Sequence, residues 1–405
     1  STFGNNVWNV HAWNVGGATL SAGTAWNTNY SGFYPDNNLD VNTINIWSAN
    51  ASPSAAPGYI GCIVNDANFS YSAKRKGFPE GEYRLSVPGI FEATELWING
   101  TRVWSIEASG GTVPGLVWTG NLDQNSEVEY RVTSADVYVN SFLRLNFTRN
   151  TTRYVKTVAT GTGDGSSWAN AMSNLQNAIN TSNDFSQVWV AAGTYNLSTS
   201  LVMKNGVGIY GGFAGTEDLI SQRNLAANIS ILTTNGTGSV ILNNENGVGS
   251  SAVLDGFTIS GGNRERGGGI ANYGASPTIR NCIFRNNTGA TRGAATSDER
   301  NSAPLYINCV FTNNSSPAGI IWAYGLIADQ GASPTFVNCT MSGNSGGSFF
   351  LYGQHGNITF RNCISWNNTS VHPWIGFSGT IAMTNSIVEG GFSGTGNMNQ
   401  NPLFV

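Results

Sequence analysis

The chain has 405 residues, of which 51 are glycine and 51 asparagine, whereas Asp, Glu, Lys and Arg together make up only 10%. A net charge of -4 with only four lysines excludes the basic surface that a nucleic-acid-binding protein uses to neutralise phosphates. No run of about 18 apolar residues is present, which excludes a membrane-spanning helix.

Residues 1–150 have the pattern of an antiparallel β domain. Short runs in which apolar and polar residues alternate, such as Glu82–Gly89, are separated by turn signals. Asn99-Gly100 lies between two of these runs, and an Asn-Gly pair in that position is the strongest short-range signal for a two-residue hairpin. We therefore expect a β-sandwich with Trp97 and Trp104 in its core.

A polar stretch at Asn146–Arg153 indicates a linker, and one amphipathic helix follows it. Apolar side chains between Trp168 and Ile179 recur at helical spacing. We expect one α-helix near residues 166–180, with Asp164 or Ser166 as its N-cap. This helix would cover the open N-terminal edge of the second domain, residues 151–405.

The second domain contains a repeat, which becomes visible when TIRNCIF, LYINCVF, TFVNCTM, TFRNCIS and AMTNSIV are aligned on one residue. VLDGFT is an earlier, degenerate copy. The aligned residues are Asp255, Asn281, Asn308, Asn338, Asn362 and Asn385, separated by 26, 27, 30, 24 and 23 residues. Periods of this length with short strands predict a solenoid.

The pattern within each copy indicates which kind of solenoid forms. A flat strand would place Ile279 and Cys282 on opposite faces, although these positions are apolar or small in every copy. A bend at Asn281 turns both inward, and Asn tolerates the left-handed backbone that such a bend needs. We therefore predict an all-β chain whose second domain is a right-handed parallel β-helix of about ten coils. Stacked coils would form a corner ladder from the aligned asparagines and an inner ladder from Cys282, Cys309, Cys339 and Cys363.

Both halves resemble known bacterial surface proteins. Residues 154–405, through GVGIYGGFAG, VLDGFTISGGN and GGGIANYGASPTIRNCIFRNN, resemble the β-helix repeats of polymorphic outer-membrane and choice-of-anchor proteins. Residues 1–148, through YSAKRKGFPEGEYRLSVPG and ELWINGTRVW, resemble a β-sandwich module of large Bacteroidetes-type proteins secreted by the type IX route. This resemblance implies an extracellular, cell-surface location, an adhesin-like or filament-building role, and a longer parent protein.

Two functions are open at this stage. The first is a non-enzymatic surface protein that presents its sandwich on a stiff β-helix, because no convergent catalytic set is visible and no catalytic residue is assigned. The alternative is a β-helix polysaccharide lyase or glycoside hydrolase. The charged clusters Arg264-Glu265-Arg266 and Asp298-Glu299-Arg300, both expected in excursions between coils, are where such an enzyme would place its reactive groups.

Candidate ligand contacts lie in a Gly/Asn-rich loop of the first domain. Sugars stack on exposed aromatic rings, so we expect a glycan or a surface protein to bind there. The residues are Trp26, Tyr30, Phe33 and Tyr34. Self-association into a surface filament is the other partner interaction that we expect.

No cofactor and no metal site are expected. The cysteine ladder is interpreted as an inert part of the core, because buried thiols behave as small hydrophobic groups. Calcium would have ligands only at Asp36, Asp40 or Asp66, and PDNNLD lacks the spacing of an EF-hand.

Overall fold

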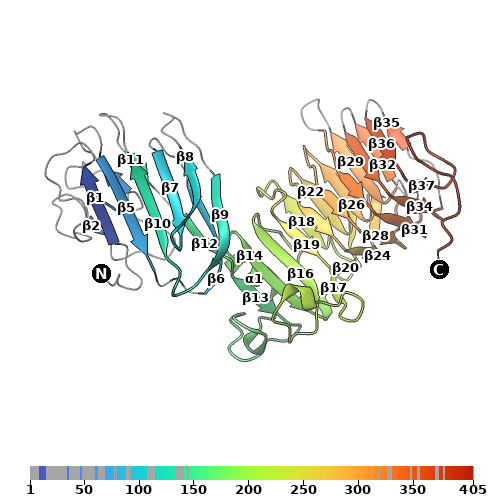
Figure 1. Ribbon diagram of the computed structural model, residues 1–405. Helices are drawn as coiled ribbons and strands as arrows, with labels where there is room; N and C mark the ends of the chain where they lie inside the picture. The colour runs from blue at the N-terminus through green and yellow to red at the C-terminus, as the bar shows by residue number, and fades with distance from the viewer. Residues whose placement is uncertain are drawn as a thin grey trace. The chain divides into compact units, whose positions relative to one another are not determined.

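The computed structural model describes residues 9–14, 34–35, 46–47, 60–62, 69–76, 78, 80–87, 93–106, 115–133, 141–143, 146–317, 319–325, 331–346, 349–353, 356–369, 374–376 and 379–404. The chain divides into two compact units, Ser1–Asn150 and Thr151–Val405 (Figure 1). Within the described ranges, no helix has the length and apolar character needed to cross a membrane.

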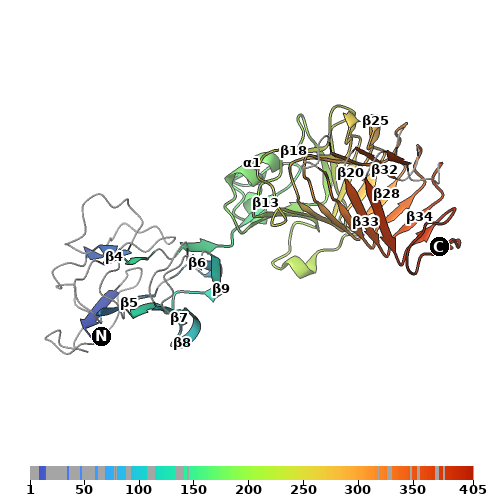
Figure 2. The same cartoon turned by 90° about the horizontal axis from the view of Figure 1, so that it is seen from above.

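The first unit is built from antiparallel sheets (Figure 2). Its five-stranded sheet has the order β1 (Asn9–Asn14), β5 (Phe69–Arg75), β10 (Val128–Thr133), β7 (Ala93–Ile98) and β8 (Thr101–Ile106). A three-stranded sheet contains β12 (Asn146–Arg149), β6 (Gly81–Val87) and β9 (Gly115–Leu122). Two short pairs are β2 (Tyr34–Pro35) with β3 (Ile46–Trp47), and β4 (Ile60–Cys62) with β11 (Ser141–Leu143).

Both of the larger sheets contribute buried side chains, as a β-sandwich requires. Leu85 of β6 and Leu96 of β7 are fully buried. The hairpin between β7 and β8 turns at Asn99 and Gly100, which have φ values of 50° and 76°. The expectation that Trp97 and Trp104 lie in the core is wrong, and both indoles are only half-buried. Trp97 alternates with the buried Leu96 and Ile98, and no residue of β8 is buried.

The second unit is a parallel β-helix with three long sheets (Figure 1). The first sheet has nine strands: β13 (Thr152–Val155), β14 (Ser186–Ala191), β16 (Val207–Phe213), β19 (Val253–Asp255), β23 (Thr278–Arg280), β27 (Leu305–Ile307), β30 (Thr335–Val337), β33 (Asn357–Arg361) and β36 (Thr380–Thr384). The second has eight: β15 (Gly193–Asn196), β17 (Ser230–Thr233), β20 (Phe257–Ser260), β24 (Ile283–Arg285), β28 (Val310–Thr312), β31 (Thr340–Ser342), β34 (Ile364–Trp366) and β37 (Ile387–Val388).

The third sheet has six strands: β18 (Ile241–Asn244), β22 (Ile270–Tyr273), β26 (Thr296–Glu299), β29 (Ile321–Gly325), β32 (Phe349–Gly353) and β35 (Trp374–Gly376). A separate pair, β21 (Asn263–Arg266) with β25 (Thr288–Arg292), leaves the coils between the second and third sheets. About 7 turns result, fewer than the roughly ten expected.

The helix at the start of the β-helix is shorter than expected. A 3-10 turn, η1 (Trp168–Asn170), precedes α1 (Leu175–Thr181), instead of one α-helix near residues 166–180. Asn174, not Asp164 or Ser166, caps α1: its side-chain oxygen accepts a hydrogen bond from the backbone N–H of Asn177 at 2.8 Å. The helix packs against β13 and β14, the first two strands of the nine-stranded sheet.

The corner between the first two sheets is made by one asparagine per coil. Asn281 lies between β23 and β24 with a φ of 53°, and Asn308, Asn338, Asn362 and Asn385 have φ values of 50° to 53°. This left-handed turn directs the residues on both sides of it inward, and Ile279 and Cys282 are fully buried. Inside, aromatic rings stack from coil to coil, as Phe284 does on Phe311 at 4.8 Å.

A second asparagine ladder lies inside the β-helix, six residues after each corner. It consists of Asn287, Asn314, Asn344 and Asn368, all buried. Each side-chain oxygen accepts from the backbone N–H and the amide of the preceding rung, as Asn314 does from Asn287 at 3.1 and 3.0 Å. Each amide also donates to a main-chain carbonyl, as Asn314 does to Phe284 at 2.9 Å. This ladder satisfies polar backbone groups that the coil buries.

Replacing Asn314 with Ala should therefore lower the free energy of unfolding by about 3 kcal/mol or more, because several buried partners lose their hydrogen bonds together. Denaturant unfolding followed by circular dichroism measures this loss. Asn308→Gly is the matched control, since it keeps the left-handed φ and removes an amide whose hydrogen bonds to Asn281 and Asn338 are exposed to water, and it should change stability by less than about 1 kcal/mol. Equal losses in both variants would contradict the prediction.

Candidate functional site

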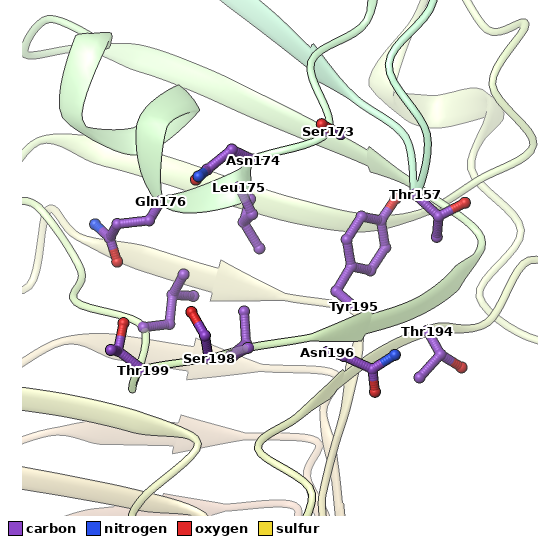
Figure 3. A pocket seen from close by; sticks show the side chains of 12 residues that line it. Thr157, Ser173, Asn174, Leu175, Gln176, Thr194, Tyr195, Asn196, Ser198 and Thr199 are labelled. Carbon is purple, nitrogen blue, oxygen red and sulfur yellow. The ribbon is translucent and has the colours of Figure 1, made fainter.

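A hollow of about 410 Å³ lies beside α1 on the first coils (Figure 3). Its two walls are the segments Ser173–Gln176 and Thr194–Thr199, with Thr157 and Leu201 at its margin. No lining residue is charged, so it lacks the acid and base groups that most hydrolytic or eliminative chemistry requires.

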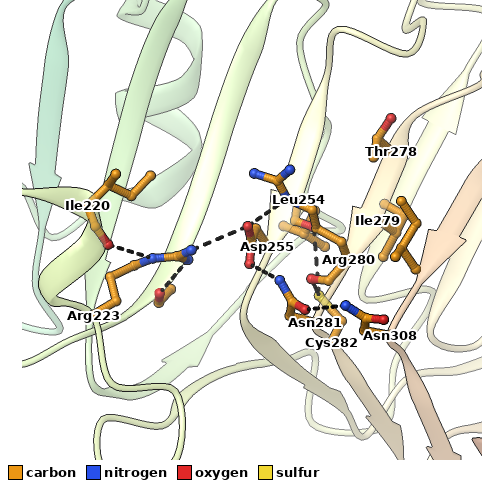
Figure 4. Close-up of polar contacts among 12 residues, drawn as sticks. Ile220, Arg223, Leu254, Asp255, Thr278, Ile279, Arg280, Asn281, Cys282 and Asn308 are labelled. Carbon is orange, nitrogen blue, oxygen red and sulfur yellow. Dashed lines mark hydrogen bonds and ion pairs between the residues drawn. The ribbon is translucent and has the colours of Figure 1, made fainter. Parts of the chain in front are cut away.

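Asp255 was aligned with the corner asparagines, but it pairs in register with Arg280, and Gly256, with a φ of 81°, makes the turn of that coil. The Asp255 carboxylate contacts three side chains around this corner (Figure 4). Its Oδ2 accepts from Arg280 at 2.7 Å and from Arg223 at 3.3 Å, and its Oδ1 accepts from the Asn281 amide at 3.0 Å. The side chain is 1% exposed. A carboxylate held by three donors has no free position for a substrate, so Asp255 serves the corner and is not a catalytic candidate.

The strongest candidate site is a cleft of about 300 Å³ on the outside of the third sheet. Sequence positions more than 50 residues apart meet in it. The lining residues are Leu242, Asn244, Arg264, Glu265, Arg266, Tyr273, Glu299 and Arg300. The two charged clusters noted in the sequence therefore converge on one surface. Arg264 to Arg266 lie in β21, an excursion as expected, whereas Asp298 and Glu299 lie in β26 within a sheet.

Most of the charges in this cleft are paired. Arg266 contacts Glu299 at 3.4 Å and Glu265 at 3.7 Å. Arg300 binds Glu245 at the rim, at 2.7 Å. Arg264 has no carboxylate partner among the described residues and donates instead to the Ser239 hydroxyl at 3.3 Å. With Glu245 included, three arginines face three glutamates, so the cleft has no net charge, and Arg264 is its one arginine without a carboxylate partner among the described residues.

Tyr273 lies at the centre of these charges. The guanidinium groups of Arg264 and Arg300 lie 5.4 and 5.5 Å from its ring centroid. Burial and the nearby Glu299 raise the pKa of the Tyr273 hydroxyl, although three arginines act against this shift. Arg264 and Arg300 therefore both contact one aromatic ring in the cleft.

A polar cluster lies behind the cleft, inside the third sheet. The Asn243 amide donates to Asn272 at 2.9 Å, and the Asn272 amide donates to Asp298 at 2.8 Å. The Tyr306 hydroxyl donates to Asp298 at 3.1 Å. Burial raises the pKa of Asp298 to about 7, against the opposing effect of these donors. Asp298 points inward while Glu299, the next residue, lines the cleft, as strand alternation requires.

The aromatic residues proposed from the sequence to bind a ligand cannot be placed in a site. Trp26, Tyr30 and Phe33 lie outside the described residues, and Tyr34 is described only as the first residue of β2. Asp36, Asp40 and Asp66 also lie outside them. In the part of the chain that is described, no group of three or more His, Cys, Asp or Glu side chains could hold a metal ion.

The cysteines of the repeat line the interior as free thiols. They are Cys282, Cys309, Cys339 and Cys363, each at most 3% exposed. Their thiols point at main-chain carbonyl oxygens, as Cys309 does toward Ile279 at 3.6 Å. Burial raises the pKa of Cys282 to about 12, so this thiol stays protonated and unreactive at neutral pH.

Sequence reasoning missed both buried polar arrays. The inner asparagine ladder follows the corner asparagines at a constant offset, so the repeat alignment carried that signal. The cluster of Asn243, Asn272 and Asp298 is aligned in register across β18, β22 and β26. These strands lack the shared sequence motif of the corner, so only the pairing of the third sheet brings these side chains together.

The described fold defines the class: the second unit is a parallel β-helix, and the cleft lies on its flank. No family model and no curated protein matches the chain. Among solved structures, the pectate lyase Pel9A has 16% identity and a TM-score of 0.41 over 59% of this chain and 63% of that one. The Agl-KA catalytic domain has 11% identity and a TM-score of 0.21 over 81% of each chain. A β-glucosidase from Kluyveromyces marxianus has 10% identity and a TM-score of 0.18 over 41% of this chain and 24% of that one.

These matches correct one expectation. The chain was expected not to be an enzyme, yet the solved structures that it matches are a lyase, a glucosidase and a catalytic domain. The similarity is one of fold and does not identify a reaction. No family model supports the expected membership in the adhesin-type repeat families. The coarser expectation of a parallel β-helix is confirmed.

The raised pKa of Asp298 predicts a pH-dependent stability. Because its pKa is about 7 in the folded chain and near 3.8 in the unfolded chain, the native state is stabilised by protonation. The contribution of Asp298 to the free energy of unfolding should be greatest below pH 4 and should fall by up to about 4 kcal/mol as the pH rises to 7. Denaturant titrations at each pH measure the slope.

Asp298→Asn provides the comparison, since an amide keeps the acceptor for Asn272 and has no charge to bury. The variant should be more stable than the parent chain at pH 7 and should lose most of the decline between pH 4 and 7. An unchanged slope would show that Asp298 does not titrate in this range.

Proposed function

We propose that the β-helix is a carbohydrate-active unit whose cleft binds an acidic polysaccharide and cleaves it by β-elimination. The observation that carries the proposal is the convergence of Arg264, Arg266 and Arg300 with Glu299 in one cleft. Guanidinium groups bind carboxylates through charge-assisted, often bidentate, hydrogen bonds. A uronate residue presents one such carboxylate per sugar, so a polyuronate chain supplies acceptors for these guanidinium groups.

The same residues supply a reaction. Pairing with Arg264 and Arg266 would neutralise the uronate carboxylate. This stabilises the negative charge that develops when the C5 proton leaves, so that proton becomes more acidic. Glu299 accepts this proton, the electron pair forms a C4–C5 double bond, and the C4–oxygen bond breaks. The departing oxygen takes a proton from water. Glu299 then returns its proton to solvent, so the step needs no oxidant or reductant.

An extracellular location accompanies this proposal, because acidic polysaccharides are components of matrices outside cells. If the first unit serves as an adhesin-like or filament-forming module, it would hold the protein, and with it the cleft, at such a matrix. Calcium dependence of this activity is a further proposal, and assays with calcium and with a chelator examine it.

The double variant Arg264→Ala/Arg266→Ala should reduce turnover of polygalacturonate or alginate at least about tenfold, because two charge-assisted contacts are removed. The measurement is the ultraviolet absorbance of new unsaturated ends. Arg285→Ala, an exposed arginine on β24 in the second sheet, is the matched control and should leave turnover unchanged. Absence of any product from these polyuronates would refute the proposed function.

Glu299→Gln tests the role of the base separately from binding. The amide keeps the size of the side chain and its contacts to Ser297 and Arg266 but accepts no proton. Turnover should fall about a hundredfold or more while KM changes little. A variant that raises KM and leaves kcat intact would assign Glu299 to binding alone.

A further inference from the structure

The hollow beside α1 differs from the cleft in its chemistry. It is lined by hydroxyl and amide side chains from two segments, Ser173–Gln176 and Thr194–Thr199 (Figure 3). Its volume of about 410 Å³ falls in the range of small-molecule sites. Unlike such sites in general, it has more polar than apolar lining, and it contains no charge.

Six of the polar side chains that line this hollow form no hydrogen bonds with other described residues. Within the described part of the chain, no hydrogen bond is formed by the side chains of Thr157, Ser173, Thr194, Asn196, Ser198 and Thr199. Hydroxyls can donate and accept, and an amide provides both a donor and an acceptor. Six such groups around one hollow form a set that can match the hydroxyl groups of a sugar in either direction.

The walls that carry these groups are held in place. Gln176 ties α1 to the opposite wall, because its amide donates to the Val202 carbonyl at 3.0 Å and accepts from the Val202 N–H at 2.8 Å. The Tyr195 hydroxyl donates to the Ala191 carbonyl at 3.0 Å, which fixes β15 to the preceding strand. A site with fixed walls loses less conformational entropy when a ligand binds.

The hollow also lies close to the sheet that carries the cleft. Leu201 on its wall forms a parallel bridge with Ile241, and the next residue of β18, Leu242, lines the cleft. Neighbouring coils of a parallel sheet are about 4.8 Å apart. The two sites therefore occupy adjoining coils of one β-helix.

We propose that this hollow is a binding site for a neutral carbohydrate, distinct from the charged cleft and independent of the function proposed for it. A uronate would enter without any cation to neutralise it, which disfavours an acidic sugar. Neutral hexose or pentose units match the hydroxyl and amide lining, and the half-buried Leu197 adds apolar surface for the faces of the ring.

The test is isothermal titration calorimetry of the full chain with cellohexaose, xylohexaose and mannohexaose, and with hexagalacturonate for comparison. At least one neutral oligosaccharide should bind. Asn196→Ala/Thr199→Val, which removes polar groups from an exposed wall, should weaken that binding about tenfold or more. Circular dichroism establishes that the variant is folded.

Asn183→Ala/Thr216→Val is the matched control, because it makes the same changes at exposed positions outside the hollow. This control, and Arg264→Ala/Arg266→Ala in the cleft, should keep the affinity for the neutral sugar within about twofold. The proposal is overturned if none of the three neutral oligosaccharides binds at millimolar concentration, or if the wall variant binds as tightly as the parent chain. Loss of neutral-sugar binding in the cleft variant alone would also overturn it. None of these results alters the outcome of the polyuronate assay.

Discussion

The β-helix depends on a left-handed turn that recurs once per coil. At the five corners from Asn281 to Asn385, between the first and second sheets, the residue that makes the turn is asparagine with a φ of 50° to 53°, and one coil earlier Gly256 has a φ of 81°. This conformation is unfavourable for most side chains, and asparagine tolerates it because its short amide finds local partners. Here the partner is the corner asparagine of a neighbouring coil, as when the Asn308 amide donates to Asn281 at 3.2 Å. The turn thus shapes the coil and also fixes the register between coils.

A fixed corner determines where variation is tolerated. The first two sheets continue with little change from coil to coil, whereas β21 and β25 leave the β-helix between the second and third sheets. This excursion brings Arg264 and Arg266 over the outer face of the third sheet, where Glu299 and Arg300 already lie. The cleft therefore combines a rigid strand with a projecting segment, an arrangement that favours a site for ligands.

The sequence was informative where a backbone constraint repeats. The corner asparagines and the cysteines beside them share a motif, so alignment alone predicts both the fold and the direction of these side chains. Strand β26 shows the limit: its sequence TSDE has no apolar residue, and pairing with β22 and β29 decides its conformation. Its inward Asp298 and outward Glu299 could not be separated without that pairing. The first unit lacks a repeat, and the hairpin at Asn99-Gly100 is predictable there because a two-residue turn is a local constraint.

The few charged residues of the β-helix are unevenly distributed in the structure. Residues 201–405 contain nine acidic side chains and eight arginines. Three of the arginines and two glutamates line one cleft, with Glu245 at its rim and Asp298 directly behind it. If the charged side chains served only to hydrate the surface, we would expect them to be spread over the coils, as the hydroxyl and amide groups are. This flank matches three arginines with three glutamates, so it has no excess of positive charge. The proposed anionic ligand would therefore be held by direct contact with guanidinium groups, of which that of Arg264 has no carboxylate partner among the described residues, and not by a long-range field.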